Sequence, residues 1–158
     1  MKQFPEGVEI KLLGNAKEIP INLLLEADPS LERIETYLRD STAFVALFKD
    51  EIIACCLVST LNEKQAEVKN IAVKESWQGK GIAQSLLYKS TSYCSENGFD
   101  LVQISTGNSS IKQLYLYQKM GFRIEKIEKG YFLKNYKEEI WENELQCLDK
   151  IVLTKQLR

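Results

Sequence analysis

The sequence predicts an α/β fold (α+β) with one mixed, mostly antiparallel sheet and flanking helices. Its 158 residues are 44% hydrophobic and 27% charged, which is typical of one domain, residues 1–158, with a substantial core. Short polar turns separate three successive β-rich runs, and such short connections require antiparallel pairing. A strand, a helix and a strand then follow one another from residue 68 to residue 105. This order predicts one parallel pair with a right-handed crossover.

In the N-terminal half, Val8 to Leu13 is expected to form the first strand because apolar and polar residues alternate at its start. Ile21 to Ala27 predicts a short helix, and Ser30 caps a second helix that runs through Arg39. These helices either cover the core or form the lip of a substrate cleft. The three antiparallel strands are then expected over Ala43 to Phe48, Ile52 to Leu61 and Ala66 to Val73.

In the C-terminal half, a helix is expected from Gly79 to about Asn97, where an Asn-Gly pair ends it. Leu101 to Ser105 is apolar and is expected to be a buried parallel strand. The remaining elements are a helix over Ile111 to Met120 and strands over Phe122 to Ile127 and Cys147 to Leu157. No pattern assigns the segment from Tyr131 to Glu144.

Composition excludes several classes of function. The chain has no histidine, which rules out Ser-His-Asp and Cys-His catalysis and any histidine-ligated zinc site. A net charge of −1 gives no basic field for nucleic acid. No apolar stretch has the length of a signal peptide or a membrane span, so a cytoplasmic protein without a membrane partner is expected.

The four cysteines point to packing and not to a metal. Cys55, Cys56, Cys94 and Cys147 form no C-x-x-C pair, so no metal site is expected. Cys55 and Cys56 lie in an apolar run, where free cysteine behaves as a small hydrophobe. A core role is therefore expected for these two.

The stretch from Val68 to Ala83 predicts a strand, a turn (Gln78-Gly79-Lys80-Gly81) and a helix start. A helix N-terminus presents free backbone N–H groups that suit a phosphate. A P-loop is excluded because Lys80 stands between the two glycines. A dinucleotide-binding turn is disfavoured because Gln84 occupies the third glycine position. The remaining pattern is Q-x-x-G-x-A, formed by Gln78, Gly81 and Ala83.

Two motifs together resemble the GCN5-related N-acetyltransferase (GNAT) superfamily. Val68 to Leu87 resembles its acetyl-CoA-binding motif, and Asn108 to Phe122 resembles its second motif, including the ending L-Y-x-K-x-G-F. The resemblance implies a GNAT fold with a sheet of six or seven strands. It also implies direct transfer of an acetyl group from acetyl-CoA to a primary amine in a ternary complex. A covalent acetyl-enzyme is not expected, because neither motif contains a cysteine with an activating base.

The resemblance implies that different segments bind different parts of acetyl-CoA. The backbone N–H groups of the turn would bind the pyrophosphate, and glycine there lets the backbone approach closely. The pantetheine arm would pair with the preceding strand like an added strand, and an N–H near Ile71 or Ala72 would polarise the thioester carbonyl. Asn108 and Ser110 are alternatives for a pantetheine hydrogen bond, because the register of this helix start is open by two residues. The expected binding residues are Ile71, Ala72, Val73, Gln78, Gly79, Lys80, Gly81, Ile82, Ala83, Asn108 and Ser110.

For catalysis, the resemblance implies that Tyr117 protonates the departing CoA thiolate. A phenol has an ordinary pKa near 10, comparable with a thiol, so the proton transfer is nearly balanced. The alternative is a buried core tyrosine. Glu67 is the candidate general base, and strand parity predicts that it shares a face with Ile71 and Val73. A water chain is the alternative proton acceptor. In that case Glu67 would be a surface residue that pairs with a lysine on the neighbouring strand.

The acceptor is expected to be a small-molecule or peptide amine. Glu139, Glu142 and Glu144 either attract such a cation or form a solvated loop. The rival function is a non-catalytic acyl-CoA-binding sensor or assembly module on the same fold. By analogy with the family, a homodimer is possible, with Cys147 to Leu157 as a candidate interface.

Overall fold

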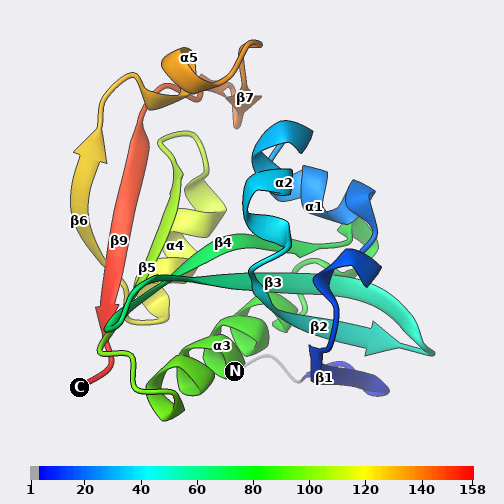
Figure 1. Cartoon of the computed structure of the whole chain (residues 1–158). Helices are drawn as coiled ribbons and strands as arrows, with labels where there is room; N and C mark the ends of the chain where they lie inside the picture. Colours follow the sequence, from blue (N-terminus) through cyan, green and yellow to red (C-terminus); the bar gives the residue numbers. More distant parts are fainter. Residues whose placement is uncertain (1–3) are drawn as a thin grey trace.

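The computed structural model describes residues 4–158, and its centre is a seven-stranded sheet with the order β1-β2-β3-β4-β5-β9-β6 (Figure 1). All neighbouring strands are antiparallel except β4 and β5, which confirms the predicted mixed sheet. The strands are β1 (Val8–Leu13), β2 (Thr42–Phe48), β3 (Glu51–Asn62), β4 (Gln65–Val73), β5 (Leu101–Gly107), β6 (Arg123–Glu128) and β9 (Lys150–Gln156).

Helices cover both faces of the sheet (Figure 1). They are α1 (Ile21–Ala27), α2 (Leu31–Leu38), α3 (Ile82–Glu96), α4 (Ile111–Lys119) and α5 (Tyr131–Asn135), with 3-10 turns η1 (Ala16–Glu18) and η2 (Glu75–Trp77). Ser30 caps α2 as predicted, because its side chain accepts from the Arg33 N–H. None of the helices within residues 4–158 combines the length and hydropathy needed to cross a bilayer.

Two apolar clusters, one on each face of the sheet, form the core. Leu86 and Leu87 of α3 pack on one face, and Leu24 of α1 and Ile34 of α2 pack on the other. Positions 54–58 of β3 alternate between the clusters, as expected of a central strand. Cys56 joins the α3 cluster and Cys55 joins the α1–α2 cluster, both fully buried, so the predicted core role of this cysteine pair is confirmed.

The parallel pair in the middle of the sheet opens towards one end. Only residues 65–68 of β4 pair with β5, whereas β4 continues to Val73 in partnership with β3 alone. The two strands therefore diverge beyond Val68, and Figure 1 shows them running apart. This split lies directly before the glycine turn, so it leaves room between the strand ends and the start of α3.

The helix predicted from Gly79 begins three residues later, at Ile82. Gly79 has φ +74° and Gly81 has φ +82°, and both angles lie in the left-handed region that right-handed helices exclude. Gly81 is the N-cap residue of α3. The turn before the helix is consequently longer than the sequence pattern indicated.

A bulge in β4 overturns the predicted orientation of Glu67. Leu57 pairs with Asn70 and Val58 pairs with Val68, so Lys69 is an extra residue without a partner in the register. The alternation of side chains changes phase there, since Val68 and Ile71 both belong to the α3-side cluster. Glu67 therefore faces the opposite side of the sheet from Ile71 and Val73, and the parity prediction was wrong.

The segment from Tyr131 to Glu144, which no pattern assigned, forms α5 and the first strand of a small hairpin. The hairpin pairs β7 (Trp141–Glu142) with β8 (Leu145–Gln146). Its two turn residues, Asn143 and Glu144, both have positive φ, as a tight hairpin turn requires. These elements lie above the open end of the sheet (Figure 1).

The last strand begins at Lys150 and not at Cys147. The side chain of Asn108 accepts hydrogen bonds from the N–H groups of Leu148 (2.7 Å) and Asp149 (3.0 Å), which holds the preceding loop away from the sheet. Strand β9 pairs with β5 on one side and β6 on the other. It therefore has no free edge for strand pairing with a second copy, and the homodimer through this segment stays a prediction.

Candidate active site

Two cavities meet where β4 and β5 diverge. The larger has a volume of about 890 Å³ and lies between the glycine turn, the start of α3 and α4. The smaller, of about 300 Å³, lies between α2, β4, β5 and the segment that contains α5 and β7. Five residues line both cavities: Ile71, Val73, Gln78, Gln113 and Tyr117. Ligands in the two cavities would therefore meet at these residues.

The larger cavity contains a helix start whose backbone N–H groups can bind an anion. The first α-helical hydrogen bond of α3 runs from the Ser85 N–H to the Gly81 carbonyl (3.1 Å). The N–H groups of residues 82–84 precede this bond, and they point out of the helix N-terminus, where the dipole favours negative charge. The predicted residues Gly79, Lys80, Gly81, Ile82 and Ala83 all line this cavity.

The conformation of the glycine turn is fixed by the Gln78 side chain and by the positive φ angles of its glycines. The Gln78 amide donates to the Val73 carbonyl at 2.9 Å, which ties the turn to the end of β4. A Cβ added at Gly79 or Gly81 would meet no protein atom within 4 Å. Glycine is therefore required here by the backbone angle, and the space beside it is available to a ligand.

Two lysines of α4, Lys112 and Lys119, also line the larger cavity, and the sequence analysis did not select them. They lie seven positions apart, which is two helical turns, so they share one face of α4. That spacing was visible in the sequence. Together with Lys80, these cations suit a ligand that carries several phosphates.

Tyr117 lies at the junction of the two cavities and is only 3% exposed. Burial, with a smaller contribution from the Cys56 thiol, raises the pKa of Tyr117 well above its ordinary value of 10. The phenol is protonated at neutral pH and can act as a proton donor, but the raised pKa makes it a weaker acid than an ordinary tyrosine, so the nearly balanced proton transfer expected from the sequence is not kept. Tyr115 lies on a different face of α4 and is 68% exposed, so it does not duplicate this position.

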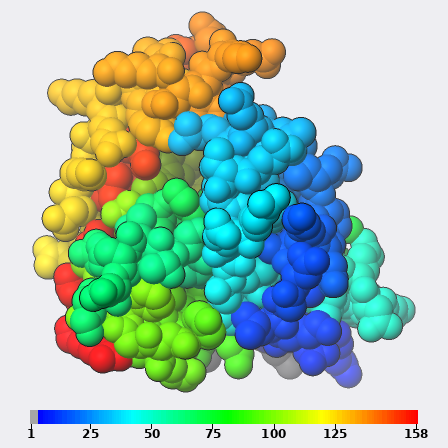
Figure 2. Space-filling view, viewed as in Figure 1, coloured from blue at the N-terminus to red at the C-terminus, as the bar shows by residue number. Residues whose placement is uncertain are grey.

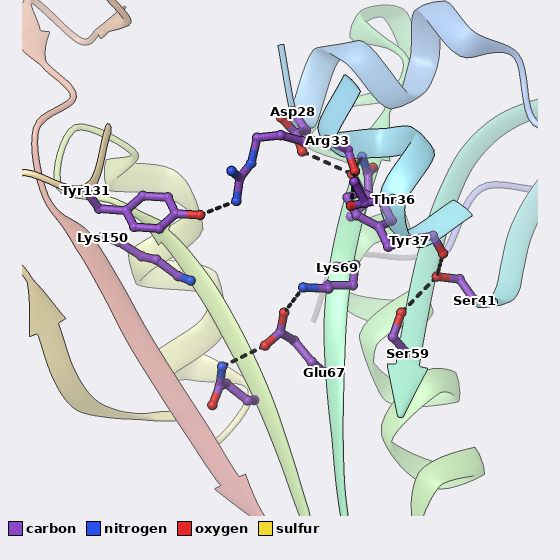
Figure 3. A network of polar contacts seen from close by, with 12 residues as sticks. Asp28, Arg33, Thr36, Tyr37, Ser41, Ser59, Glu67, Lys69, Tyr131 and Lys150 are labelled. Atoms are coloured by element: carbon purple, nitrogen blue, oxygen red, sulfur yellow. Dashed lines mark hydrogen bonds and ion pairs between the residues drawn. The ribbon is translucent and has the colours of Figure 1, made fainter. Parts of the chain in front are cut away.

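Glu67 lines the smaller cavity and is 8% exposed. Figure 3 shows its side chain in contact with Lys69. Its Oε1 lies 2.6 Å from the Lys69 ammonium, and its Oε2 accepts a 2.7 Å hydrogen bond from the Gln103 amide. The expected alternative, a surface glutamate paired with a cross-strand lysine, is wrong in both respects. The lysine is on the same strand, and the carboxylate is buried in a cavity.

The two alternatives for a pantetheine contact lie in different places. Asn108 lines neither cavity, and its amide is bonded to the backbone of Gln146, Leu148 and Asp149. Ser110 lines the smaller cavity, where its hydroxyl donates to the Glu142 carboxylate at 3.2 Å. The structure thus places Ser110 in the smaller cavity and not in the cavity of the glycine turn, and it leaves Asn108 with a role in holding the loop before β9.

Of the predicted acidic cluster, only Glu142 lines the smaller cavity. Glu139 instead accepts a hydrogen bond from the indole N–H of Trp141 (3.1 Å), and Glu144 is a turn residue of the hairpin. One carboxylate is therefore placed to attract an amine.

The smaller cavity has an aromatic and charged wall that the sequence analysis did not identify. The Asp28 carboxylate accepts hydrogen bonds from the hydroxyls of Tyr37 (3.2 Å) and Tyr136 (2.9 Å). Burial, with a further contribution from Asp28, raises the pKa of both tyrosines well above 10. The Arg33 guanidinium donates to the Tyr131 hydroxyl (Figure 3). These contacts join the α1–α2 region to the C-terminal segment, and Figure 2 shows the two regions meeting at the surface.

Comparison with known proteins agrees with this geometry. The model of the Acetyltransferase (GNAT) family matches residues 17–122, which contain both sequence motifs and the glycine turn. The chain belongs to the GNAT acetyltransferase family. The uncharacterized N-acetyltransferase YvbK of Bacillus subtilis is 42% identical over 148 residues, covering 94% of this chain and 96% of the relative.

Two solved GNAT structures resemble this chain closely. A GNAT family acetyltransferase from Elizabethkingia anophelis with acetyl-CoA bound is 41% identical, with a TM-score of 0.91 over 96% of this chain and 99% of the other. A Bacillus subtilis acetyltransferase in complex with CoA is 38% identical, with a TM-score of 0.89 over 96% and 99%. Close GNAT neighbours of this chain therefore bind acetyl-CoA or CoA.

Proposed function

We propose that this GNAT member transfers the acetyl group of acetyl-CoA directly to the primary amine of a small acceptor in a ternary complex. The larger cavity takes acetyl-CoA, with the pyrophosphate at the start of α3 and the pantetheine arm along residues 71–73 of β4. The smaller cavity takes the acceptor. Its volume of about 300 Å³ is at the lower end of the range for small-molecule sites.

The observation that carries this proposal is the position of Tyr117, which lines both cavities. A donor at that junction is adjacent to the thioester and to the attacking amine at once. The phenol is protonated at neutral pH, which is the form that a general acid needs, and burial makes it a weaker acid than an exposed tyrosine. The cysteines do not suit a covalent route. Burial raises the pKa of Cys147, which lines the smaller cavity, and raises the pKa of Cys55 and Cys56 to about 12 and of Cys94 to about 11.

In the proposed step, the amine nitrogen attacks the thioester carbonyl, a C–N bond forms and the C–S bond breaks. The Tyr117 hydroxyl gives its proton to the departing sulfur. The bound ammonium first loses one proton to solvent water, and the neutral amine loses its second proton to Glu67, directly or through water, as the amide forms, since Glu67 lines the acceptor cavity. A backbone N–H near Ile71 or Ala72 polarises the carbonyl oxygen during attack.

The test is acetyl transfer by the purified protein, followed as CoA thiol release with a panel of amines, and its comparison with Tyr117→Phe. Phenylalanine keeps the ring in its buried site and removes only the hydroxyl. We expect kcat to fall by roughly 10²–10⁴-fold, the usual contribution of a positioned acid, with acetyl-CoA affinity unchanged.

The rival sensor or assembly function gives a different result. A sensor would bind acetyl-CoA in calorimetry but release no CoA with any amine of the panel. Tyr117→Phe would then leave the acetyl-CoA affinity unchanged, and neither protein would release CoA. Absence of acetyl-CoA binding to the wild-type protein at millimolar ligand would contradict both functions.

A further inference from the structure

Three cations from three separate elements point towards one space in the smaller cavity (Figure 3). Arg33 comes from α2, Lys69 from β4 and Lys150 from the start of β9. A cavity that takes a cationic amine does not need three cations in its wall. A cation that no carboxylate neutralises can bind an anionic group of the ligand, so the ion pairs of each of the three are considered in turn.

Lys69 is neutralised inside the cavity. Its ammonium lies 2.6 Å from Oε1 of Glu67, which also lines the cavity. This pair contributes no net charge to the wall, and Lys69 is left out of the argument below.

Arg33 and Lys150 have no carboxylate partner in the cavity. Among residues 4–158, Arg33 has no carboxylate within ion-pairing distance, and the ion pair of Lys150 is with Glu128 at 3.7 Å. Glu128 does not line the cavity. The nearby Asp28 is held by neutral donors, the hydroxyls of Tyr37 and Tyr136.

Both cations are instead packed against aromatic rings. The Lys150 ammonium lies 4.6 Å from the centroid of the Tyr131 ring, and the Arg33 guanidinium carbon lies 5.5 Å from the same centroid. Arg33 also lies 5.3 Å from the centroid of Tyr136. Cation–π contacts fix the position of a cation but leave its charge available to an anion. Two cations beside one phenol form a preorganised site for an oxyanion.

The opposite sign is present elsewhere in the same cavity. Glu26, Asp28, Glu67 and Glu142 line it. Glu67 is paired with Lys69, Asp28 accepts from two tyrosine hydroxyls, and Glu142 accepts from the Ser110 hydroxyl. A ligand that satisfies the whole wall therefore carries an ammonium group and an oxyanion.

We propose that the acceptor is a small amine that also carries an oxyanion, a carboxylate or a phosphate, bound by Arg33 and Lys150 beside Tyr131. This inference rests on the proposed function, since it assigns the smaller cavity to the acceptor. It adds the chemical class of the acceptor, and it names two specificity residues outside both GNAT motifs.

The test compares matched amines that differ only in the anion. Amino acids are paired with the amines that lack their carboxylate, and O-phosphoethanolamine is paired with ethanolamine. We expect kcat/KM to be at least tenfold higher for the anionic member of the pairs. Preference within the first set identifies a carboxylate, and preference within the second identifies a phosphate. Equal or better turnover of the neutral amines in all pairs would overturn the proposal.

Substitutions at Arg33 and Lys150 test whether these two residues cause the preference for anionic amines. Arg33→Met and Lys150→Met should each raise KM for the preferred anionic amine about tenfold or more, with little change for its neutral counterpart and for acetyl-CoA. Lys134→Met is the matched control, because Lys134 is an exposed lysine on α5 that lines neither cavity. An unchanged KM in a folded Lys150→Met variant and in a folded Arg33→Met variant would contradict the assignment.

Calorimetry of the same amines with the CoA-saturated protein separates this inference from the proposed function. If anionic amines bind, lose affinity in Arg33→Met and are never acetylated, the anion site stands and the catalytic function fails. If neutral amines are acetylated as well as anionic ones, the catalytic function stands and the anion site fails. If no anionic amine binds or reacts, the anion site is overturned.

Discussion

The hydroxyl of Tyr136 donates a 2.9 Å hydrogen bond to Oδ1 of Asp28, joining positions that are 108 residues apart. Asp28 ends α1, and Tyr136 follows α5, so the bond closes one side of the smaller cavity. We expect Tyr136→Phe to lower the free energy of unfolding by about 1 kcal/mol, the usual net value of one hydrogen bond. We also expect a several-fold rise in acceptor KM, measured by CoA release, because this wall loosens.

Tyr88→Phe is the matched control, since Tyr88 is 65% exposed and lines neither cavity. It removes the same hydroxyl group from a surface site. If both variants changed KM equally, the bond to Asp28 would have no part in shaping the smaller cavity.

Alkaline pH should destabilise the protein through its buried phenols. Tyr37, Tyr117 and Tyr136 all have pKa values raised above 10, with burial as the largest cause. The unfolded chain releases these protons near pH 10, whereas the folded chain retains them, so their stabilising effect is full below about pH 10 and declines as pH rises further. Tyr117 alone should contribute a slope of up to about 1.4 kcal/mol per pH unit.

Urea unfolding at several alkaline pH values measures this slope. Tyr117→Phe should reduce it by the equivalent of one proton, whereas Tyr115→Phe, at an exposed position, should leave it unchanged. Phenolate absorbance of the native protein gives a second measurement. Early ionisation of all seven tyrosines, before unfolding, would contradict the burial argument.

The thiols should be unreactive in the native protein. All four cysteines are free and buried, and burial raises their pKa values, to about 12 for Cys55 and Cys56. A coloured disulfide reagent should label less than one thiol in the native protein and four after denaturation. Intact mass after incubation with acetyl-CoA should stay unchanged. An added acetyl group on a cysteine would argue against direct transfer.

Local patterns predicted most of the fold and one of the two cavities. The strands of the first hairpins, the glycine turn and the helix with Tyr117 each depend on residues close in sequence, so periodicity and turn chemistry identify them. The smaller cavity depends on contacts such as Arg33 to Tyr131, which are 98 positions apart. No local pattern encodes such a pair.

Two further failures have specific physical causes. The phase change in β4 comes from a single unpaired residue, Lys69, and a bulge has no periodic signature. Helix α5 has five residues and β7 has two, which is too short for a period of 3.6 or 2 to appear. The hairpin turn Asn143-Glu144 also lacks the glycine that usually marks such turns.

Glu67 has two candidate roles, and a pair of variants separates them. If Glu67 is the general base, Glu67→Gln should lower kcat roughly 10²-fold or more, whereas Lys69→Met should leave kcat nearly unchanged. The amide of Gln can still contact Gln103, so the local structure is kept. Equal effects of the two variants would mean that Glu67 acts only by holding Lys69 at 2.6 Å.

The glycine turn can be tested by separating backbone strain from ligand binding. Gly81 has φ +82°, so Gly81→Ala should cost roughly 1–2 kcal/mol of stability, the penalty of a left-handed angle for an L-residue. The new methyl group would also occupy space that no protein atom fills, on the wall of the larger cavity. We expect the Kd for acetyl-CoA, measured by calorimetry, to rise about tenfold, a loss of about 1.4 kcal/mol in binding.

Gly98→Ala supplies the matched control for this experiment. Gly98 has φ +86°, a Cβ there would also meet no atom within 4 Å, and the residue follows the far end of α3, away from both cavities. It should lose the same stability and keep its affinity for acetyl-CoA. If both variants weakened binding equally, strain transmitted through α3 would explain the effect. If Gly81→Ala bound as well as the wild type, the pyrophosphate would not lie against this turn.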